Sequence, residues 1–239
     1  MAQIFPRWTN QTPRLITLGA LAGLGATVFA VYWWASPYHT DVGYAPKQPV
    51  EYSHELHAGT LKMDCRYCHV GVEQGAFAGV PPTQTCMNCH KQVKPDSELL
   101  KPVRESWATD KSIEWKRIHK LPDFAYFNHS AHVGVGTGDK RAAIGCETCH
   151  GRIDTMKVVR QVQPLSMSWC LDCHSNPGPN LRPVEHITTM GWSADMAWQE
   201  QQRQIAATLN PPGSLSGAQK FVDGEYKTFA TAGCSGCHR

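Results

Sequence analysis

Apolar residues are distributed unevenly along the chain and concentrate in one run near the N-terminus. The segment LITLGALAGLGATVFAVYWWA, Leu15 to Ala35, holds 21 residues without a charge. A helix of this length rises about 30 Å, the thickness of the hydrocarbon core of a bilayer. The pattern therefore predicts a transmembrane helix over residues 15–35, preceded by an N-terminal segment over residues 1–14.

The charges on either side of this run predict its orientation. Arg7 and Arg14 precede the run, and the first basic residue after it is Lys47. The positive-inside rule then places the N-terminus in the cytoplasm and exports the rest of the chain. A cleaved signal peptide is the alternative, because Val28–Ala30 has the small residues of a cleavage site. The apolar run continues through Trp34 and is longer than the apolar region of a signal peptide, which favours an uncleaved anchor.

Downstream of the anchor the chain is poor in residues that build a hydrophobic core. Only 41 % of all residues are hydrophobic, below the roughly 45 to 50 % of globular proteins. Residues 36–51 are rich in Pro and Gly and predict an extended periplasmic spacer. The segment 193–210 predicts a helix with Ser193 as its N-cap and the following Pro-Pro-Gly as its stop. Elsewhere we expect short helices and long loops.

The formal net charge of +3 does not indicate a nucleic-acid partner. An exported chain without a run of basic residues lacks the electrostatic pattern of a nucleic-acid-binding protein. We therefore expect no nucleic acid among its partners.

The cysteines follow a single rule along the whole chain. All 10 fall into five Cys-x-x-Cys pairs, and a histidine follows each pair directly. The pairs are Cys65/Cys68, Cys86/Cys89, Cys146/Cys149, Cys170/Cys173 and Cys234/Cys237, and the histidines are His69, His90, His150, His174 and His238. With 12 His in 239 residues, five such coincidences have a probability of roughly 3 × 10⁻⁷. Composition does not explain the pattern.

This spacing is typical of c-type haem attachment. Two thiols at a fixed short separation form thioether bonds to the haem vinyl groups, and the next residue turns its imidazole to the iron as the proximal ligand. A disulfide scaffold or zinc ribbons leave the histidines unexplained, and a thioredoxin-type motif does not occur five times. The sequence therefore predicts five covalently bound haem c groups. The predicted fold class is a multihaem cytochrome c, mainly short α-helices and loops around stacked haems, with one N-terminal transmembrane helix.

Two segments of the chain resemble each other and indicate a duplication. YSHELHAGTLKMDCRYCH and FNHSAHVGVGTGDKRAAIGCETCH both run from an aromatic residue through His-x-x-His to a haem motif, and a second motif follows each. We interpret residues 52–114 as dihaem module 1 and residues 115–182 as dihaem module 2. Residues 183–239 form a C-terminal segment with the fifth haem.

The histidines of the repeated unit are candidates for the distal ligands of the irons. His54 and His57 in module 1, like His129 and His132 in module 2, are three residues apart and lie on one side of a helical turn. Two imidazoles so placed can reach two neighbouring irons and clamp stacked haems. A lone histidine is more often a solvated surface residue, but repetition before a haem motif favours ligation. Replacing His57 should then disturb a haem other than the first.

Three further residues are candidate distal ligands. His119 lies just ahead of the second unit and is the next best ligand, with a hydrogen bond to a haem propionate as its alternative. Met190 and His186 are candidates for the fifth haem, with Met190 preferred. A Met sulfur would raise the potential of that haem relative to a bis-His haem. His39 lies next to the anchor, far along the sequence from any haem motif, and is interpreted as structural.

Several blocks taken in order resemble a known family. GYAPKQPV, SHELHAG with DCRYCH, PPTQTCMNCH, HKLPDFAYFNHSAH and LSMSWCLDCH are similar to the pentahaem cytochrome c subunit of bacterial alternative complex III, a quinol-oxidising respiratory complex. The resemblance runs from the anchor to His238. It implies mostly bis-His haems and one His/Met haem. It also implies a single-pass protein of the bacterial cytoplasmic membrane, with its haem domain on the periplasmic side.

The same resemblance implies partners. These are an iron–sulfur subunit similar to molybdopterin oxidoreductases, polytopic membrane subunits that hold the quinol site, and a monohaem cytochrome c. The favoured hypothesis is an electron-transfer wire in a quinol:cytochrome c oxidoreductase of a respiratory or photosynthetic chain. Such a subunit is not itself an enzyme, because haems ligated on both faces offer no open position to a substrate.

Two alternatives stay open at the level of the sequence. A multihaem reductase, such as one acting on nitrite, needs a five-coordinate iron, and the chain has enough candidate ligands to fill all five. A self-sufficient anchored multihaem quinol dehydrogenase would hold its first haem close to the membrane helix, whereas Cys65 lies 30 residues beyond Ala35.

Overall fold

The computed structural model describes residues 4–134, 142–209, 220–222, 225–227 and 234–238. The chain divides into two compact units, Met1–Val42 and Gly43–Arg239. The module boundaries predicted at residues 52, 115 and 183 fall inside the second unit and stay predictions.

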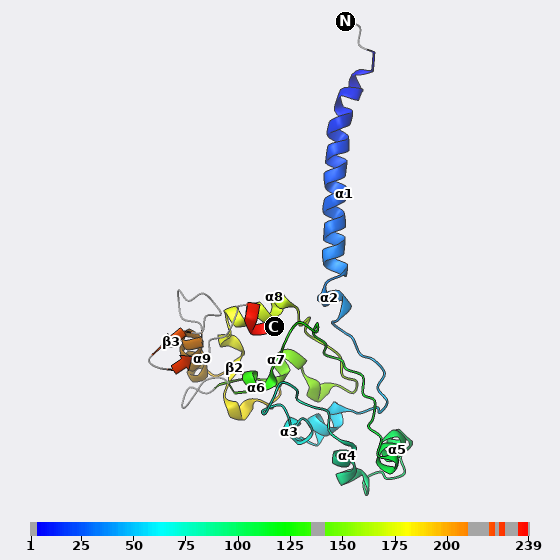
Figure 1. Cartoon of the computed structure of the whole chain (residues 1–239), viewed down its shortest axis with the longest axis vertical. Coiled ribbons are helices and arrows are strands. Elements are labelled where there is room, and N and C mark those ends of the chain that lie inside the picture. Colours follow the sequence, from blue (N-terminus) through cyan, green and yellow to red (C-terminus); the bar gives the residue numbers. More distant parts are fainter. Residues whose placement is uncertain (1–3, 135–141, 210–219, 223–224, 228–233, 239) are drawn as a thin grey trace. The chain divides into compact units, whose positions relative to one another are not determined.

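The first unit is built on one long helix. α1 spans Thr12–Trp34, after a 3-10 turn (η1) over Arg7–Gln11 and before α2 over Pro37–Thr40 (Figure 1). Pro13 lies in the first turn of α1, where its missing N–H loses no hydrogen bond. No side chain of α1 is buried, and the continuous helical stretch is long and apolar enough to cross a bilayer. The helix predicted over residues 15–35 is therefore present, with slightly shifted ends.

The second unit consists of short elements joined by long connections (Figure 1). Its helices are η2 (Glu55–Thr60, a π-helix), α3 (Cys65–Cys68), α4 (Thr83–His90), η3 (Glu98–Leu100), α5 (Lys101–Thr109), α6 (His129–His132), α7 (Cys146–His150), η5 (Ile153–Thr155), α8 (Met167–Ser175), η6 (Gly178–Asn180), η7 (Val184–His186), α9 (Met196–Leu209) and α10 (Cys234–Cys237). Its strands are β1 (Ala143–Ile144), β2 (Leu181–Arg182), β3 (Lys220–Val222) and β4 (Glu225–Lys227). β1 pairs antiparallel with β2, and β3 pairs antiparallel with β4. The expectation of short helices and loops is met.

Buried apolar side chains form three small clusters in place of one large core. Val50, Met87 and Val103 form the first. Val133, Ala143 and Ile187 form the second, with Val72 and Cys146 packed against it, so it joins both predicted modules and the C-terminal segment. Ala142, Leu181 and Ile205 form the third and attach α9 to β2.

The start of α9 differs from the prediction. The sequence predicts a helix capped by Ser193, but the helix begins at Met196. The carboxylate of Asp195 accepts a hydrogen bond from the backbone N–H of Trp198 at 2.8 Å and caps the helix instead. Ser and Asp are both good capping residues. The indole of Trp198 is held in place because its Nε1 donates to the Leu181 carbonyl at 2.9 Å. Asp195 is nearer to Trp198 than Ser193 is, and it sets the start of the helix. The predicted Pro-Pro-Gly stop lies outside the described residues.

Candidate functional site

All five Cys-x-x-Cys-His motifs lie on short helices. The cysteines are on α3, α4, α7, α8 and α10, so one helical turn brings the two cysteines of each pair to the same side. α3 is capped by Asp64, which accepts from the Arg66 N–H at 2.8 Å, and α8 by Ser166, which accepts from the Trp169 N–H at 3.3 Å. None of the cysteines whose side chains are described forms a disulfide; the side chain of Cys234 lies outside them.

Three histidine pairs have the spacing that two axial ligands of one iron require. Iron–nitrogen bonds of about 2.0 Å, with about 1.15 Å from each nitrogen to its ring centre, hold the two ring centroids about 6.3 Å apart. The centroids of His57 and His90 are 6.3 Å apart, and those of His132 and His174 are 6.1 Å apart. The third pair, His129 and His150, has a spacing of 6.4 Å and nearly parallel planes, at 6°. Each pair joins a proximal histidine to a histidine of the repeated unit.

Hydrogen bonds at Nδ1 leave Nε2 of most of these rings available as a ligand. A ring nitrogen that bonds a carbonyl must carry the proton, so the other nitrogen keeps its lone pair. Nδ1 donates to a backbone carbonyl in both proximal and candidate distal histidines. The pairs are His57 to Ser53 (2.9 Å), His69 to Gly79 (2.7 Å), His90 to Val93 (2.9 Å), His129 to Ala76 (2.7 Å), His132 to Asn128 (2.7 Å) and His238 to Phe124 (3.1 Å). Such bonds orient metal-ligating histidines in general.

An aromatic ring holds the two histidines of each repeated unit in the same way. Tyr52 meets His54 edge-on at 83° and stacks on His57 at 20°. Phe127 meets His129 edge-on at 87° and stacks on His132 at 30°. The repeated aromatic position seen in the sequence is therefore a support for both imidazoles, a role that the sequence alone does not show.

The attachment motifs lie close to one another in space. Burial first, and then the neighbouring thiol of Cys86, raise the pKa of Cys68. Burial, and then Cys173 and Cys170, raise the pKa of Cys149 to about 12. The first motif thus lies beside the second, and the third beside the fourth.

Two more contacts extend this series of motifs. The neighbouring Cys146 lowers the pKa of Cys65, and burial, and then the nearby Cys237, raise the pKa of Cys170. The motifs therefore follow one another in the spatial order second, first, third, fourth, fifth.

His54 and His119 are half-buried, and burial favours their neutral form. Burial, and then the charges of His69 and His57, lower the pKa of His54 to about 4. Its Nδ1 is buried without a hydrogen-bond partner, which ordinarily costs about 1 to 3 kcal/mol. Burial, and then His129, lower the pKa of His119 to about 4. His119 contacts His150, with Nε2 of His119 3.3 Å from Nδ1 of His150.

The contacts described for the candidate ligands of the fifth haem are with residues outside the fifth motif. His238 stacks on Phe124 at 5.6 Å. The ring of His186 stacks on Trp192 at 5.9 Å, and its Nδ1 is 3.2 Å from the Thr189 hydroxyl.

The loop that carries His186 and Met190 is tied to the first and third motifs. Thr188 donates to Asp64 at 3.1 Å, and the carbonyl of Ile187 accepts from the Cys146 N–H at 3.1 Å. These contacts give no support to ligation of the fifth haem by Met190 or His186, which stays a prediction. His39 is part of α2 in the first unit.

A buried ion pair fixes this loop to the third motif. Arg182 donates to Glu147 at 2.9 Å, with side chains only 7 % and 15 % exposed. Glu147 also accepts from the Gly191 N–H at 2.6 Å, and Arg182 donates to the Thr189 carbonyl at 3.1 Å. Glu147 is one of the two variable residues of its Cys-x-x-Cys motif, so no pattern in the sequence pointed to the pair.

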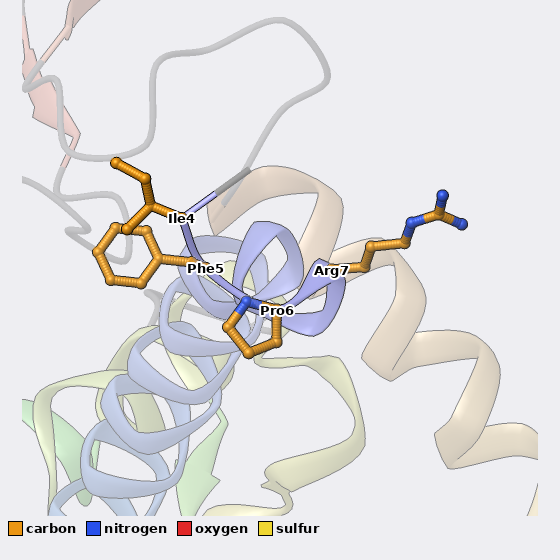
Figure 2. A pocket seen from close by; sticks show the side chains of 4 residues that line it. All are labelled: Ile4, Phe5, Pro6 and Arg7. Atoms are coloured by element: carbon orange, nitrogen blue, oxygen red, sulfur yellow. The ribbon is translucent and has the colours of Figure 1, made fainter. Parts of the chain in front are cut away.

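A hollow in the first unit lies apart from these histidines. It is lined by Ile4, Phe5, Pro6 and Arg7, and Figure 2 shows the Arg7 side chain pointing away from Ile4 and Phe5. Its lining carries no haem ligand type, and it does not belong to the haem motifs.

Repeated attachment motifs on short helices, with imidazole pairs at iron-ligating distance, are the features of a multihaem c-type cytochrome. No family model matches the chain. Its sequence is 34 % identical over 146 residues to the multihaem cytochrome c subunit of menaquinone reductase from Nitratidesulfovibrio vulgaris strain Hildenborough. The match covers 59 % of this chain and 64 % of that relative, so the chain spans less than two thirds of the relative's length. This similarity supports the multihaem cytochrome c class.

Proposed function

We propose that the chain is a membrane-anchored pentahaem c-type cytochrome that carries electrons within a quinone-linked oxidoreductase complex. The observation that carries this proposal is the set of three histidine pairs at 6.1 to 6.4 Å, the spacing of two imidazoles bound to one iron. Haem c bound in this way supplies reversible one-electron transfer and no open coordination position.

The residues of the chain hold the haems in defined roles. The ten cysteines provide the thioether links, and His69, His90, His150, His174 and His238 are the proximal ligands. We assign His57 to the second haem and His132 to the fourth, because their rings face His90 and His174. His129 faces His150 and is assigned to the third haem. His54 is the first histidine of its unit, as His129 is of the other, and by this equivalence it is assigned to the first haem.

The electron-transfer role follows from ligation on both faces and from the order of the motifs. Histidines clamp four of the irons, and the fifth is proposed to take Met190, or else His186, as its sixth ligand. On this proposal no iron is open to a substrate, and the subunit itself is not an enzyme. The contact between Cys65 and Cys146 joins the two modules at their first motifs. The second motif then marks one end of the series and the fifth marks the other.

More specifically, we propose that the chain is a subunit of a quinol:cytochrome c oxidoreductase of the alternative complex III type. The sequence blocks that resemble its pentahaem subunit support this, as does the apolar helix α1, which would anchor the chain in the bacterial cytoplasmic membrane with the haem domain in the periplasm. The partners would then be the iron–sulfur subunit, the polytopic quinol-binding subunits and a monohaem cytochrome c.

The similarity to a menaquinone reductase subunit favours a second candidate function. In that case the haems would deliver electrons to a quinone and not receive them from a quinol. The two functions use the same haem ligands and differ in the direction of electron flow.

The complex extracted from native membranes distinguishes these functions. The pyridine haemochromogen assay should give five haem c per chain, and magnetic resonance of the oxidised protein should show low-spin irons. Reduction of the haems by a menaquinol analogue, followed by reduction of added cytochrome c, is expected for the favoured function. Oxidation of pre-reduced haems by a menaquinone analogue, with no electron transfer to cytochrome c, would establish the second. Fewer than five haems, or rapid cyanide binding to an open iron, would refute both.

A further inference from the structure

The Nδ1 atom of His150 faces another side chain, unlike the Nδ1 atoms of His69, His90 and His238. His69, His90 and His238 all donate from Nδ1 to a backbone carbonyl. At His150 the partner is Nε2 of His119 at 3.3 Å, with ring centroids 4.3 Å apart and planes at 85°. The main chain fixes the partner of these three rings, whereas substitution can change the partner of His150.

The distance between these two rings excludes a shared iron. Two imidazoles on one iron have centroids about 6.3 Å apart, and the 4.3 Å between His119 and His150 leaves no room for a metal. His129 lies 6.4 Å from His150, with planes within 6°. The three rings therefore fit one arrangement, in which His129 and His150 bind the iron and His119 contacts the outer nitrogen of His150.

We propose that His119 is a positioning residue of the third haem, which accepts a hydrogen bond at Nε2 from the Nδ1–H of His150. This inference rests on the proposed function and departs from the expectation that His119 binds an iron directly. An acceptor at this place fixes the tautomer and the ring orientation of the ligand and makes the ligand more basic. A more basic imidazole stabilises ferric over ferrous iron, so His119 lowers the potential of this haem.

The size of the effect follows from the worth of one hydrogen bond. Loss of a neutral hydrogen bond ordinarily changes an equilibrium constant about fivefold. At 59 mV per tenfold change for one electron, the potential of the third haem should rise by about 40 mV. The other four haems should keep their potentials.

The test compares two substitutions in the full-length protein purified in detergent. His119→Leu removes the acceptor, whereas His119→Gln keeps a polar group at the end of a side chain of similar reach. His129→Leu serves as the control that removes an iron ligand. Haem content, magnetic resonance of the oxidised protein and a potentiometric titration are recorded for each variant. We expect five low-spin haems in both His119 variants, a rise of about 40 mV for one haem in His119→Leu, and a near-normal potential in His119→Gln.

Each other outcome has a defined meaning. A high-spin haem in His119→Leu would overturn the proposal, because His119 would then be an axial ligand. An unchanged potential in His119→Leu, or the same shift in both variants, would overturn it as well, since the hydrogen bond would not tune the haem. A wild-type protein with fewer than five haems would refute the proposed function and not this contact in particular.

Discussion

Replacement of His57 gives the sharpest test of the ligand pairing. The ring of His57 lies 6.3 Å from that of His90 and carries its proton on Nδ1, which donates to the Ser53 carbonyl. His57→Ala therefore removes the sixth ligand of the second haem and leaves the first haem, attached to the nearer motif, intact. About one fifth of the total haem should change from low-spin to high-spin on the proposed count of five.

Optical spectra and magnetic resonance of the oxidised variant measure this fraction. Added imidazole should refill the vacated position and restore the low-spin state. His132→Ala, the equivalent change in module 2, should convert a similar fraction at the fourth haem, and His39→Ala should convert none.

The identity of the affected haem is tested by removing its attachment. A variant that combines His57→Ala with Cys86→Ala and Cys89→Ala should bind four haems and show no high-spin signal, because the haem that lost its ligand is no longer present. A high-spin signal that persists in this variant would show that His57 serves another iron, and the pairing of His57 with His90 would be wrong.

Three further predictions concern stability. Arg182→Met leaves a buried carboxylate unpaired and should lower the free energy of unfolding by about 3 kcal/mol. Arg203→Met breaks an exposed ion pair and should change the free energy of unfolding by less than about 0.5 kcal/mol. Denaturation by urea, followed by circular dichroism, measures both. Gly59→Ala places a methyl group against a backbone carbonyl of η5 and should lower the free energy of unfolding by about 1 to 3 kcal/mol. The added methyl group of Gly75→Ala meets no atom within 4 Å, so this control should leave the midpoint of urea denaturation nearly unchanged. The side-chain hydrogen bond from Arg66 lowers the pKa of Asp64 to about 2. The ionised Asp64 therefore contributes to stability above about pH 4, and this contribution is lost as the pH falls toward 2. In Asp64→Asn the free energy of unfolding should change less with pH in this window, as measured by acid titration.

The proposed attachment motifs could be found in the sequence because their chemistry is local. A covalent haem requires two cysteines and a histidine within five consecutive residues, and this pattern needs no knowledge of the fold. The repeated His-x-x-His units were visible for the same reason. In the first repeated unit an α-helical turn was expected, but η2 is a π-helix over Glu55–Thr60 with His54 at its N-cap. π-helical turns are frequent at functional sites.

Contacts between distant segments could not be predicted in the same way. His119 and His150 are separated by 31 residues. The position of His119 just ahead of the second His-x-x-His unit suggested an iron ligand as readily as a residue that supports one. β1 and β2 have two residues each, too few for an alternating pattern to indicate a strand. At α9 the sequence predicted Ser193 as the cap, and in the structure Asp195 takes that role by accepting from the Trp198 N–H.

The duplication has a structural consequence that goes beyond the similarity of two segments. Each repeated unit docks on the segment that follows the first motif of the other module. In module 1, the N–H of Glu55 donates to the Met156 carbonyl at 3.0 Å. In module 2, the N–H of Ser130 donates to the Gly75 carbonyl at 3.1 Å.

Cys65 and Cys146, the equivalent first cysteines of the two modules, meet between them. Such reciprocal contacts are those of a two-fold symmetric interface, in which each partner uses the same surface. The two predicted modules therefore contact each other in a reciprocal way, with their first motifs between them. His119 breaks this symmetry, because Nδ1 of His150 faces His119 whereas Nδ1 of His69 donates to the Gly79 carbonyl. On the proposed assignment the third haem should therefore differ in potential from its equivalent, the first.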